Sequence, residues 1–317
     1  MTFKILLSDT DLSRLIQMSP NVYLAKILPN RIFRTYLYII GVAYYLIKGG
    51  ERKATSRSLR CTLDSKLCGR NVKWVVLKTY KGIIDHYYEK MINAYTSPST
   101  IMNFLKSYAT IQNQQWLDEK AASGKGCLFV SGHFGSVEYI PLLLAAYEYH
   151  PTIIVRYKTE KLRQVLVQNS QYVDLDLIDA DQSNVVFKAL EAIRNGRTLI
   201  TLCDEFKHWK PCKTSELCVF GQTIPRDRSL DIIFKRAKVP TCLGLLHRCE
   251  KGNSLKIHPI SEGKDDISLS ERAWKLMEEN IYRFPEQWYQ WPNLQNELEK
   301  YITIRNEYAN KCHFAEK

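Results

Sequence analysis

The hydrophobic pattern of the chain changes near residue 126. Beyond that point short apolar runs recur, and stretches with helical spacing of apolar residues separate the first four of them. Strands that alternate with helices predict an α/β fold with a largely parallel central sheet flanked by helices. The predicted strands are Cys127–Ser131, Thr152–Arg156, Asp174–Ile178, Thr198–Leu202 and Thr241–His247. The predicted helices are Val137–Tyr149, Lys161–Gln171, Val185–Asn195, Ser268–Tyr282 and Gln295–Tyr308.

The first 125 residues have a helical pattern instead. The clearest helix runs from Asn71 to Tyr95, where apolar residues recur at helical spacing and Asn71 is placed to cap the first turn. Ser97-Pro98-Ser99 interrupts the pattern, and we expect a second helix from there to about Lys120. The chain is therefore expected to consist of a helical N-terminal region, residues 1–125, and an α/β core, residues 126–317, in one integrated unit.

The N-terminal region contains the best candidate for contact with a membrane. Thr35–Ile47 carries no charge and is rich in tyrosine, but it is shorter than the roughly 20 apolar residues that a spanning helix needs. A buried core helix and a helix that lies in the bilayer interface both fit this segment. Tyrosine suits the interface because its ring is apolar and its hydroxyl polar. Ile5–Leu7 is too short to be the core of a secretory signal.

The charge balance favours a helix in the bilayer interface over a buried core helix. The formal net charge is +12, which indicates an anionic partner. Ten basic residues lie between Lys48 and Lys81, directly after the tyrosine-rich segment, and only Glu51 and Asp64 oppose them. A solvated basic helix face also fits, but this arrangement is typical of binding to an anionic leaflet. We therefore expect peripheral or monotopic membrane attachment. No nucleic-acid-binding motif accompanies the charge.

The nine cysteines indicate reduced thiols, because their number is odd and no Cys-x-x-Cys pair occurs. Cys203, His208, Cys212 and Cys218 have spacings that match no common zinc module, so no metal is expected. There is also no P-loop and no Gly-x-Gly-x-x-Gly motif, which leaves no sign of a bound nucleotide.

The most informative stretch follows the first predicted strand and reads from Ser131 to Glu138, SGHFGSVE. Functional groups of parallel α/β sheets gather just past the carboxyl ends of the strands. His133 lies there between two glycines, and Glu138 can reach it only if the turn bends back, which Gly135 permits. A carboxylate on one ring nitrogen fixes the tautomer, so that the other nitrogen can accept a proton from a hydroxyl. A structural histidine beside an exposed glutamate fits the pair equally well.

This stretch resembles the His-x4-Asp/Glu motif of the glycerolipid acyltransferase superfamily. It is most similar to the branch that contains the late lauroyl and myristoyl acyltransferases of lipid A biosynthesis. Further stretches resemble the family's elements in the same order, over about residues 32 to 292. They are Ile154-Val155-Arg156-Tyr157, Asp204-Glu205, Val219-Phe220-Gly221 and the run from Pro285 to Trp291.

The resemblance implies an O-acyltransferase of the cytoplasmic face of an inner membrane, without a cofactor. It would move a fatty acyl group from a thioester, of acyl carrier protein or coenzyme A, to a hydroxyl of a lipid or glycolipid. His133 is then predicted to be the general base and Glu138 to orient it. The other predicted substrate-binding residues are Arg156, Asp204, Glu205 and Arg228.

Departures from the family pattern leave the acceptor open. Pro292 and Asn293 follow Trp291, where the family usually has His-Arg-Arg, and Glu205 stands where it usually has glutamine. A phospholipid acyltransferase, an enzyme that acylates an unusual lipid precursor and a noncatalytic membrane-bound relative remain alternatives. Trp288 and Trp291 are expected to pack the C-terminal segment onto the core rather than line a substrate groove.

Overall fold

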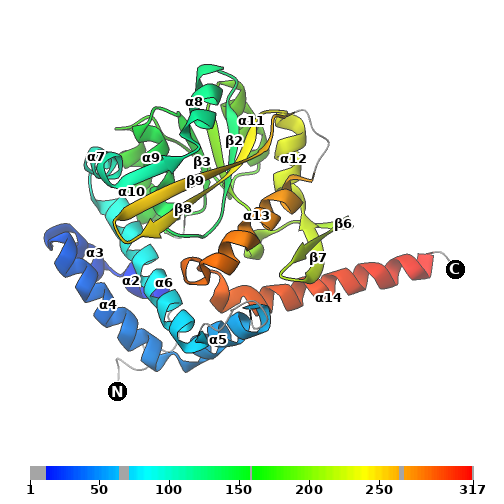
Figure 1. Cartoon of the computed structure of the whole chain (residues 1–317), viewed down its shortest axis with the longest axis horizontal. Coiled ribbons are helices and arrows are strands. Elements are labelled where there is room, and N and C mark those ends of the chain that lie inside the picture. The colour runs from blue at the N-terminus through cyan, green and yellow to red at the C-terminus, as the bar shows by residue number, and fades with distance from the viewer. Residues whose placement is uncertain (1–11, 64–70, 158, 264–267, 316–317) are drawn as a thin grey trace.

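A seven-stranded sheet is the centre of the fold (Figure 1). The computed structural model describes residues 12–63, 71–157, 159–263 and 268–315. The strands lie in the order β1-β9-β8-β2-β5-β3-β4. Their bounds are β1 Ala109–Gln112, β2 Cys127–Ser131, β3 Pro151–Val155, β4 Asp176–Asp179, β5 Thr198–Leu202, β8 Thr241–Cys249 and β9 Gly252–Ser261. All five predicted strands are therefore confirmed, in a mixed α/β fold with a mostly parallel sheet.

The five strands β8, β2, β5, β3 and β4 run parallel to one another, while β9 pairs antiparallel with β8. β2 and β5 are direct neighbours in register from Cys127 opposite Thr198 to Ser131 opposite Leu202. The segments that follow these two strands, from Gly132 and from Cys203, therefore leave the sheet side by side. This topology brings the turn of His133 next to Asp204, although the two residues are far apart in sequence.

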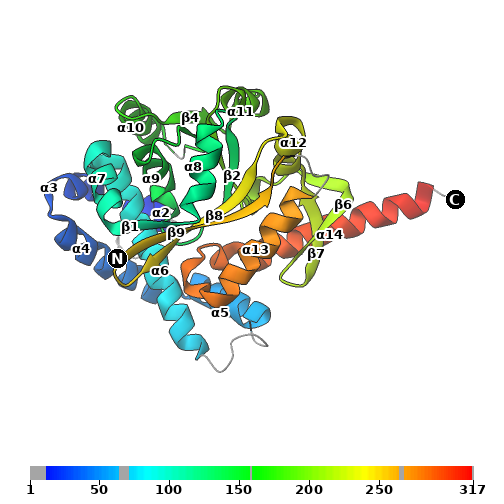
Figure 2. The ribbon, with the colours of Figure 1, turned by 45° about the horizontal axis from the view of Figure 1, so that its top comes forward.

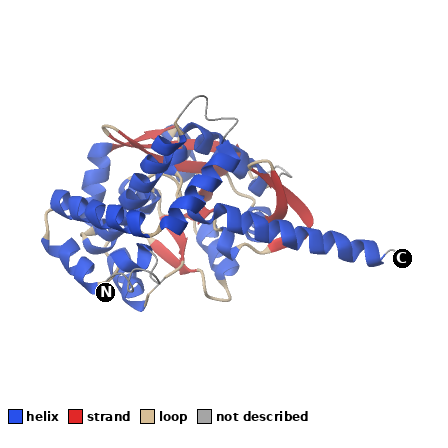
Figure 3. Ribbon diagram, turned by 90° about the horizontal axis from the view of Figure 1, so that it is seen from below, coloured by secondary structure: helices blue, strands red, loops and turns tan. Residues whose placement is uncertain are grey.

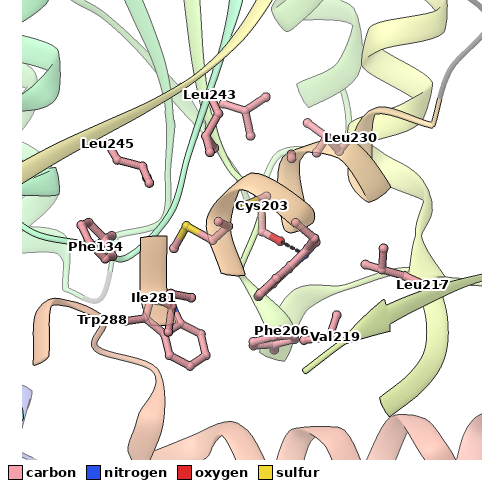
Figure 4. Close-up of a cluster of buried hydrophobic side chains, with 14 of the residues drawn as sticks. Phe134, Cys203, Phe206, Leu217, Val219, Leu230, Leu243, Leu245, Ile281 and Trp288 are labelled. Atoms are coloured by element: carbon pink, nitrogen blue, oxygen red, sulfur yellow. Dashed lines mark hydrogen bonds between the residues drawn. The ribbon is translucent and has the colours of Figure 1, made fainter. Parts of the chain in front are cut away.

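Apolar side chains of β2 lie on both faces of the sheet, because successive side chains of a strand point to opposite faces. Leu128 and Val130 join one hydrophobic cluster together with α11–α13, and Phe129 joins a second cluster with α9 and the N-terminal helices. Figure 4 shows part of the first cluster, in which Phe134 lies below Leu245 and Trp288 lies beside Ile281. The core helices are α9 Ile140–Ala146, α10 Glu160–Ser170, α11 Val185–Arg194, α12 Arg228–Ala237 and α13 Leu269–Arg283.

The N-terminal region is helical, as predicted, and packs along the side of the sheet domain (Figures 1 and 2). Asn71 caps α6 by accepting a hydrogen bond from Lys73 N, and Ser97 caps α7 in the same way. The helices are α2 Leu12–Ile16, α3 Ser19–Ile27, α4 Asn30–Ile47, α5 Gly49–Leu63, α6 Val72–Tyr95, α7 Pro98–Tyr108 and α8 Gln114–Ala122. No helix in the described part of the chain is long and apolar enough to cross a membrane.

One predicted helix is wrong. The expected helix from Ser97 to about Lys120 is divided by strand β1, which pairs with β9 far along the chain. Asn113, with φ of 62°, then turns the chain into α8. Pairing with β9 outweighs the local helical pattern because the strand gains a row of backbone hydrogen bonds at the sheet edge.

A separate hairpin and a long C-terminal helix complete the fold (Figure 3). Residues Pro211–Val219 and Gln222–Asp227 form an antiparallel hairpin, β6 and β7, apart from the main sheet. Helix α14, Trp291–Ala315, is longer than predicted and extends past this hairpin (Figure 1). Its first turns are anchored by buried apolar side chains, namely Trp291, Leu294, Leu298 and Tyr301.

Candidate active site

The turn that carries His133 requires glycine at position 135 more strictly than at position 132. A Cβ at Gly132 would overlap the side chain of Met277, and a Cβ at Gly135 would overlap the carbonyl oxygen of Leu246. Gly135 also has φ of 57°, a left-handed conformation that glycine adopts without strain. The sequence prediction of a sharp turn at this position is confirmed.

Neighbouring segments hold the turn by backbone hydrogen bonds. Tyr289 N donates to His133 O at 3.0 Å, and Gly135 N donates to Gln287 O at 2.8 Å. Ser136 N donates to Leu246 O at 2.8 Å, at the end of β8. The turn is therefore fixed by the η3 segment, Pro285–Gln287, and the residues after it on one side and by the sheet on the other.

Asp204 is the direct partner of the imidazole. Its Oδ1 lies 2.9 Å from His133 Nδ1, while its Oδ2 accepts from the backbone N–H of His133 and from the indole N–H of Trp288, both at 2.8 Å. The Asp204 side chain is fully buried. Asp204 was predicted to bind substrate, but its carboxylate lies behind His133 and is occupied by these donors. This position suits an orienting group better than a substrate ligand.

The other ring nitrogen faces the open side. His133 Nε2 lies 3.5 Å from Glu205 Oε1, and the Glu205 side chain is 44% exposed. The side-chain amide of Gln290 lies 3.0 Å from His133 Nδ1. Burial by itself lowers the pKa of His133, but the charge and hydrogen bond of Asp204, with Glu205 and Glu138 beyond it, raise this pKa to about 9.

Glu138 lies in the same cavity as His133 but contacts different groups. Its Oε1 is 3.6 Å from His86 Nε2 and 3.7 Å from Lys90 Nζ, both on α6. Asn93 Nδ2 donates to the Glu138 backbone carbonyl at 3.1 Å. Among the hydrogen bonds of the described residues, none joins Glu138 to the imidazole. The predicted orienting position is thus occupied by Asp204, and the charge of Glu138 acts on His133 across the cavity.

The cavity has a volume of about 490 Å³, within the range of small-molecule sites. Its polar part is lined by His133, Glu138, Glu205 and the two α6 residues His86 and Lys90. Much of the remaining lining is apolar and comes from the sheet and from helices α9 and α10, and we call this part the apolar limb. The apolar limb is lined by Ile140, Leu142, Ile153, Leu162, Leu166, Leu175, Leu177, Ile200 and Leu202.

The two predicted arginines have different positions. Arg156 lines the cavity and forms an ion pair with Asp181. Its charge also reaches His208, whose pKa is lowered by burial and by Arg156. Arg228 is exposed at the start of α12 and does not line this cavity. The prediction that Arg228 joins the substrate site therefore finds no support in the geometry.

Sequence reasoning missed His86 and Lys90. They stand four residues apart in the best-predicted helix, and this spacing places them side by side on one helical face. The sequence could not show which part of the molecule this face meets. Only the packing of α6 against the segment η1, Val137–Tyr139, reveals it.

A comparison with protein-family profiles identifies the family of the chain. The profile of the bacterial lipid A biosynthesis acyltransferase family matches residues 23–293. The chain belongs to this family. A search of curated proteins finds no match. Family membership identifies the chain as an acyltransferase that acts on a lipid.

The remaining expectations concern aromatic and sulfur side chains of this acyltransferase. Trp288 and Trp291 are fully buried in the core, so the prediction that they pack the C-terminal segment is confirmed. Cys203 is buried behind the site, and burial raises its pKa, which disfavours a thiolate nucleophile. In the described part of the chain no group of three His, Cys, Asp or Glu side chains could hold a metal ion.

Proposed function

We propose that this acyltransferase moves a fatty acyl group from a thioester, of acyl carrier protein or coenzyme A, to a hydroxyl of a lipid or glycolipid, with His133 as the general base. The observation that carries the proposal is the placement of His133. Its Nδ1 is held by the buried Asp204, and its Nε2 faces a cavity with an apolar limb. The limb suits a fatty acyl chain because burial of each methylene contributes about 0.8 kcal/mol.

The proton transfers follow from this orientation. With Nδ1–H donating to Asp204, Nε2 carries the lone pair that accepts the acceptor's hydroxyl proton. The alkoxide oxygen attacks the thioester carbonyl and forms a tetrahedral intermediate. Its collapse breaks the carbon–sulfur bond, and the leaving thiolate takes the proton from His133. Asp204 stabilises the imidazolium between these two transfers.

Backbone amides of the turn are poorly placed to stabilise the oxyanion. The N–H groups from His133 to Ser136 already donate to Asp204 Oδ2 and to the carbonyl oxygens of Gly132, Gln287 and Leu246. Side-chain donors that line the cavity are the better candidates, and we assign this role to Lys90 and Arg156. Glu205, half-exposed beside Nε2, is proposed to bind the polar part of the acceptor.

Purified protein tests this function directly. We expect release of free thiol and a mass increase of the acceptor by one acyl group, when lauroyl and myristoyl thioesters are offered with lipid A precursors and with lysophospholipids. Comparison of carrier-protein and coenzyme A thioesters then identifies the donor. The family's donor is expected to be the carrier protein, whose acidity suits the basic surface of this chain. Thiol release without any acylated lipid would instead indicate a hydrolase and contradict the proposal.

We further propose that helix α4 attaches the protein to the cytoplasmic face of an anionic membrane. Four apolar side chains on its outer side, Ile32, Ile39, Val42 and Leu46, are each more than half exposed, at 55%, 66%, 53% and 63%. Their spacing places them on one helical face. The next helix, α5, adds exposed basic residues, Lys53, Arg57 and Arg60. An apolar face beside a basic one is typical of a helix that lies in the bilayer interface.

Replacement of Arg52, Lys53, Arg57 and Arg60 by glutamine is expected to weaken binding to anionic vesicles. Each basic residue near an anionic surface contributes about 1 kcal/mol, so the combined loss should exceed tenfold at low salt and diminish as salt is added. Vesicle sedimentation at several salt concentrations measures this. A matched control replaces Lys125, Lys161, Arg194 and Arg236, four exposed residues of the sheet domain. If both variants bind as the parent does, α5 is not part of the membrane anchor.

A further inference from the structure

A buried ion pair lies directly behind the His133 turn. Glu89 of α6 and Arg248 of β8 form two hydrogen bonds, from Arg248 Nε to Oε1 at 2.7 Å and from Nη2 to Oε2 at 2.8 Å. Their side chains are only 8% and 17% exposed. Burial of two charges carries a desolvation penalty that their attraction barely offsets, so such a pair is seldom explained by stability alone.

Glu89 binds the turn itself. The Ser136 hydroxyl donates to Glu89 Oε1 at 2.9 Å, three residues after His133. The Ser136 backbone N–H is bound to Leu246 of β8 at the same time. Glu89 therefore joins the turn to α6, the helix that also carries His86 and Lys90 into the cavity.

Arg248 holds the other side of the turn. Its backbone N–H donates to Gln287 Oε1 at 2.8 Å, and its carbonyl accepts from Gln287 Nε2 at 3.1 Å. The Gln287 carbonyl in turn accepts the Gly135 N–H. The guanidinium of Arg248 also lies 5.3 Å from the ring centroid of Tyr289, whose N–H binds the His133 carbonyl. The three backbone hydrogen bonds that join the turn to Gln287, Leu246 and Tyr289 thus each include a residue that Glu89 or Arg248 contacts.

We propose that Glu89 and Arg248 are positioning residues for His133: together they fix the turn between α6 and β8, so that Nε2 points at the acceptor hydroxyl. The proposal rests on the proposed function of His133 as the base. A displacement of about 1 Å can reduce turnover by 10²-fold, because proton transfer requires close alignment of donor and acceptor. Neither residue needs to touch substrate for this effect.

Glu89→Gln and Arg248→Lys test the proposal with the least change of shape. Glutamine retains an acceptor for Ser136 but loses the charge, and lysine retains the charge but loses the two-pronged contact. We expect kcat to fall by about 10- to 100-fold while KM for donor and acceptor changes less than threefold. Ser136→Ala keeps both members of the ion pair but removes the hydroxyl that links Glu89 to the turn and that also lies 3.1 Å from Asn253 Oδ1, and it should lower kcat in the same direction.

Asp231→Asn is the matched control. Asp231 and Arg226 form an ion pair of similar burial, 10% and 21% exposed, with 3.1 Å between Asp231 Oδ2 and Arg226 Nε, but it lies between β7 and α12, away from the turn. Its loss should lower the melting temperature as much as Glu89→Gln does and leave kcat per folded molecule near that of the parent. Equal kcat losses in both variants would show that stability alone is involved and would overturn the proposal.

A double-mutant cycle that combines Glu89→Gln with His133→Ala distinguishes the positioning role of Glu89 from the proposed function of His133 as the base. If Glu89 acts through His133, Glu89→Gln should cause no further loss of the residual activity when His133 is already alanine. A full additional loss in that background would contradict a positioning role. Parental kcat in Glu89→Gln, Arg248→Lys and Ser136→Ala, beside an inactive His133→Ala, would overturn the positioning proposal alone. Parental activity of His133→Ala would overturn the proposed function instead.

Discussion

His133→Ala is expected to lose most of its acyl-transfer activity, on the order of 10²- to 10⁴-fold in kcat, which is the usual contribution of a general base. The structure provides a reason to expect the upper part of this range. Glu205, a carboxylate on the open side, is half-exposed, and among the contacts of the described residues it has no orienting partner like that of His133 in Asp204. KM should change much less, because the imidazole acts chiefly in the transition state.

The variant must be folded for this result to count. Removal of the imidazole leaves Asp204 with two donors, the backbone N–H of residue 133 and the indole of Trp288. The loss of one hydrogen bond to the buried carboxylate lowers the stability of His133→Ala. His133→Gln keeps a donor near Asp204 and therefore serves as a second variant. A structural role of His133 predicts a lower melting temperature with normal turnover per folded molecule. Folded protein that transfers acyl groups at the parental rate would rule out the mechanism proposed here.

Asp204→Asn is expected to have the second largest effect, because it changes both the tautomer and the pKa of His133. An asparagine cannot stabilise the imidazolium, and loss of such a carboxylate commonly reduces turnover on the order of 10²- to 10⁴-fold. The pKa of His133 is about 9 beside Asp204, so the neutral base is a minority form at pH 7. For the parent, kcat/KM should rise with pH until about 9. In the variant this rise should occur at lower pH, towards the ordinary value of 6.5.

The same shift links stability to pH. The folded pKa of His133 lies above its ordinary value, so its stabilisation is full below pH 6.5 and is lost as the pH rises through 9. For the parent this contribution is about 3 kcal/mol. Unfolding by urea at a series of pH values should show the decline in the parent and a flatter curve in Asp204→Asn. A pH profile of kcat/KM that does not move in this variant would contradict the assignment of Asp204.

The activity of Glu138→Gln should be compared with that of Asp204→Asn. Its carboxylate contacts His86 and Lys90 and reaches His133 only across the cavity, so a loss of about tenfold, or ~1.4 kcal/mol, is expected. Equal losses in Glu138→Gln and Asp204→Asn would mean that the two carboxylates share the orienting role. The sequence motif pointed to Glu138, whereas the geometry points first to Asp204.

The sequence by itself determined the local features of this protein. Short apolar runs located the five parallel strands, and apolar residues at helical spacing located the helices between the first four of them. Asn71 was recognisable as a helix cap, because its side chain binds a backbone group only two residues away. The glycines around His133 likewise indicated a turn, which made this histidine the leading site residue.

Only the tertiary structure decided which groups meet His133. Asp204 is 71 residues away in sequence, and Arg248 is 159 residues from Glu89. The register of β2 with β5 brings the first pair together, and packing of α6 against the end of β8 brings the second. The edge strand β1 likewise forms through pairing with β9, which lies far along the chain. Local patterns encode the period of an element but not its neighbour, because neighbours are selected by the burial and hydrogen bonding of the whole chain.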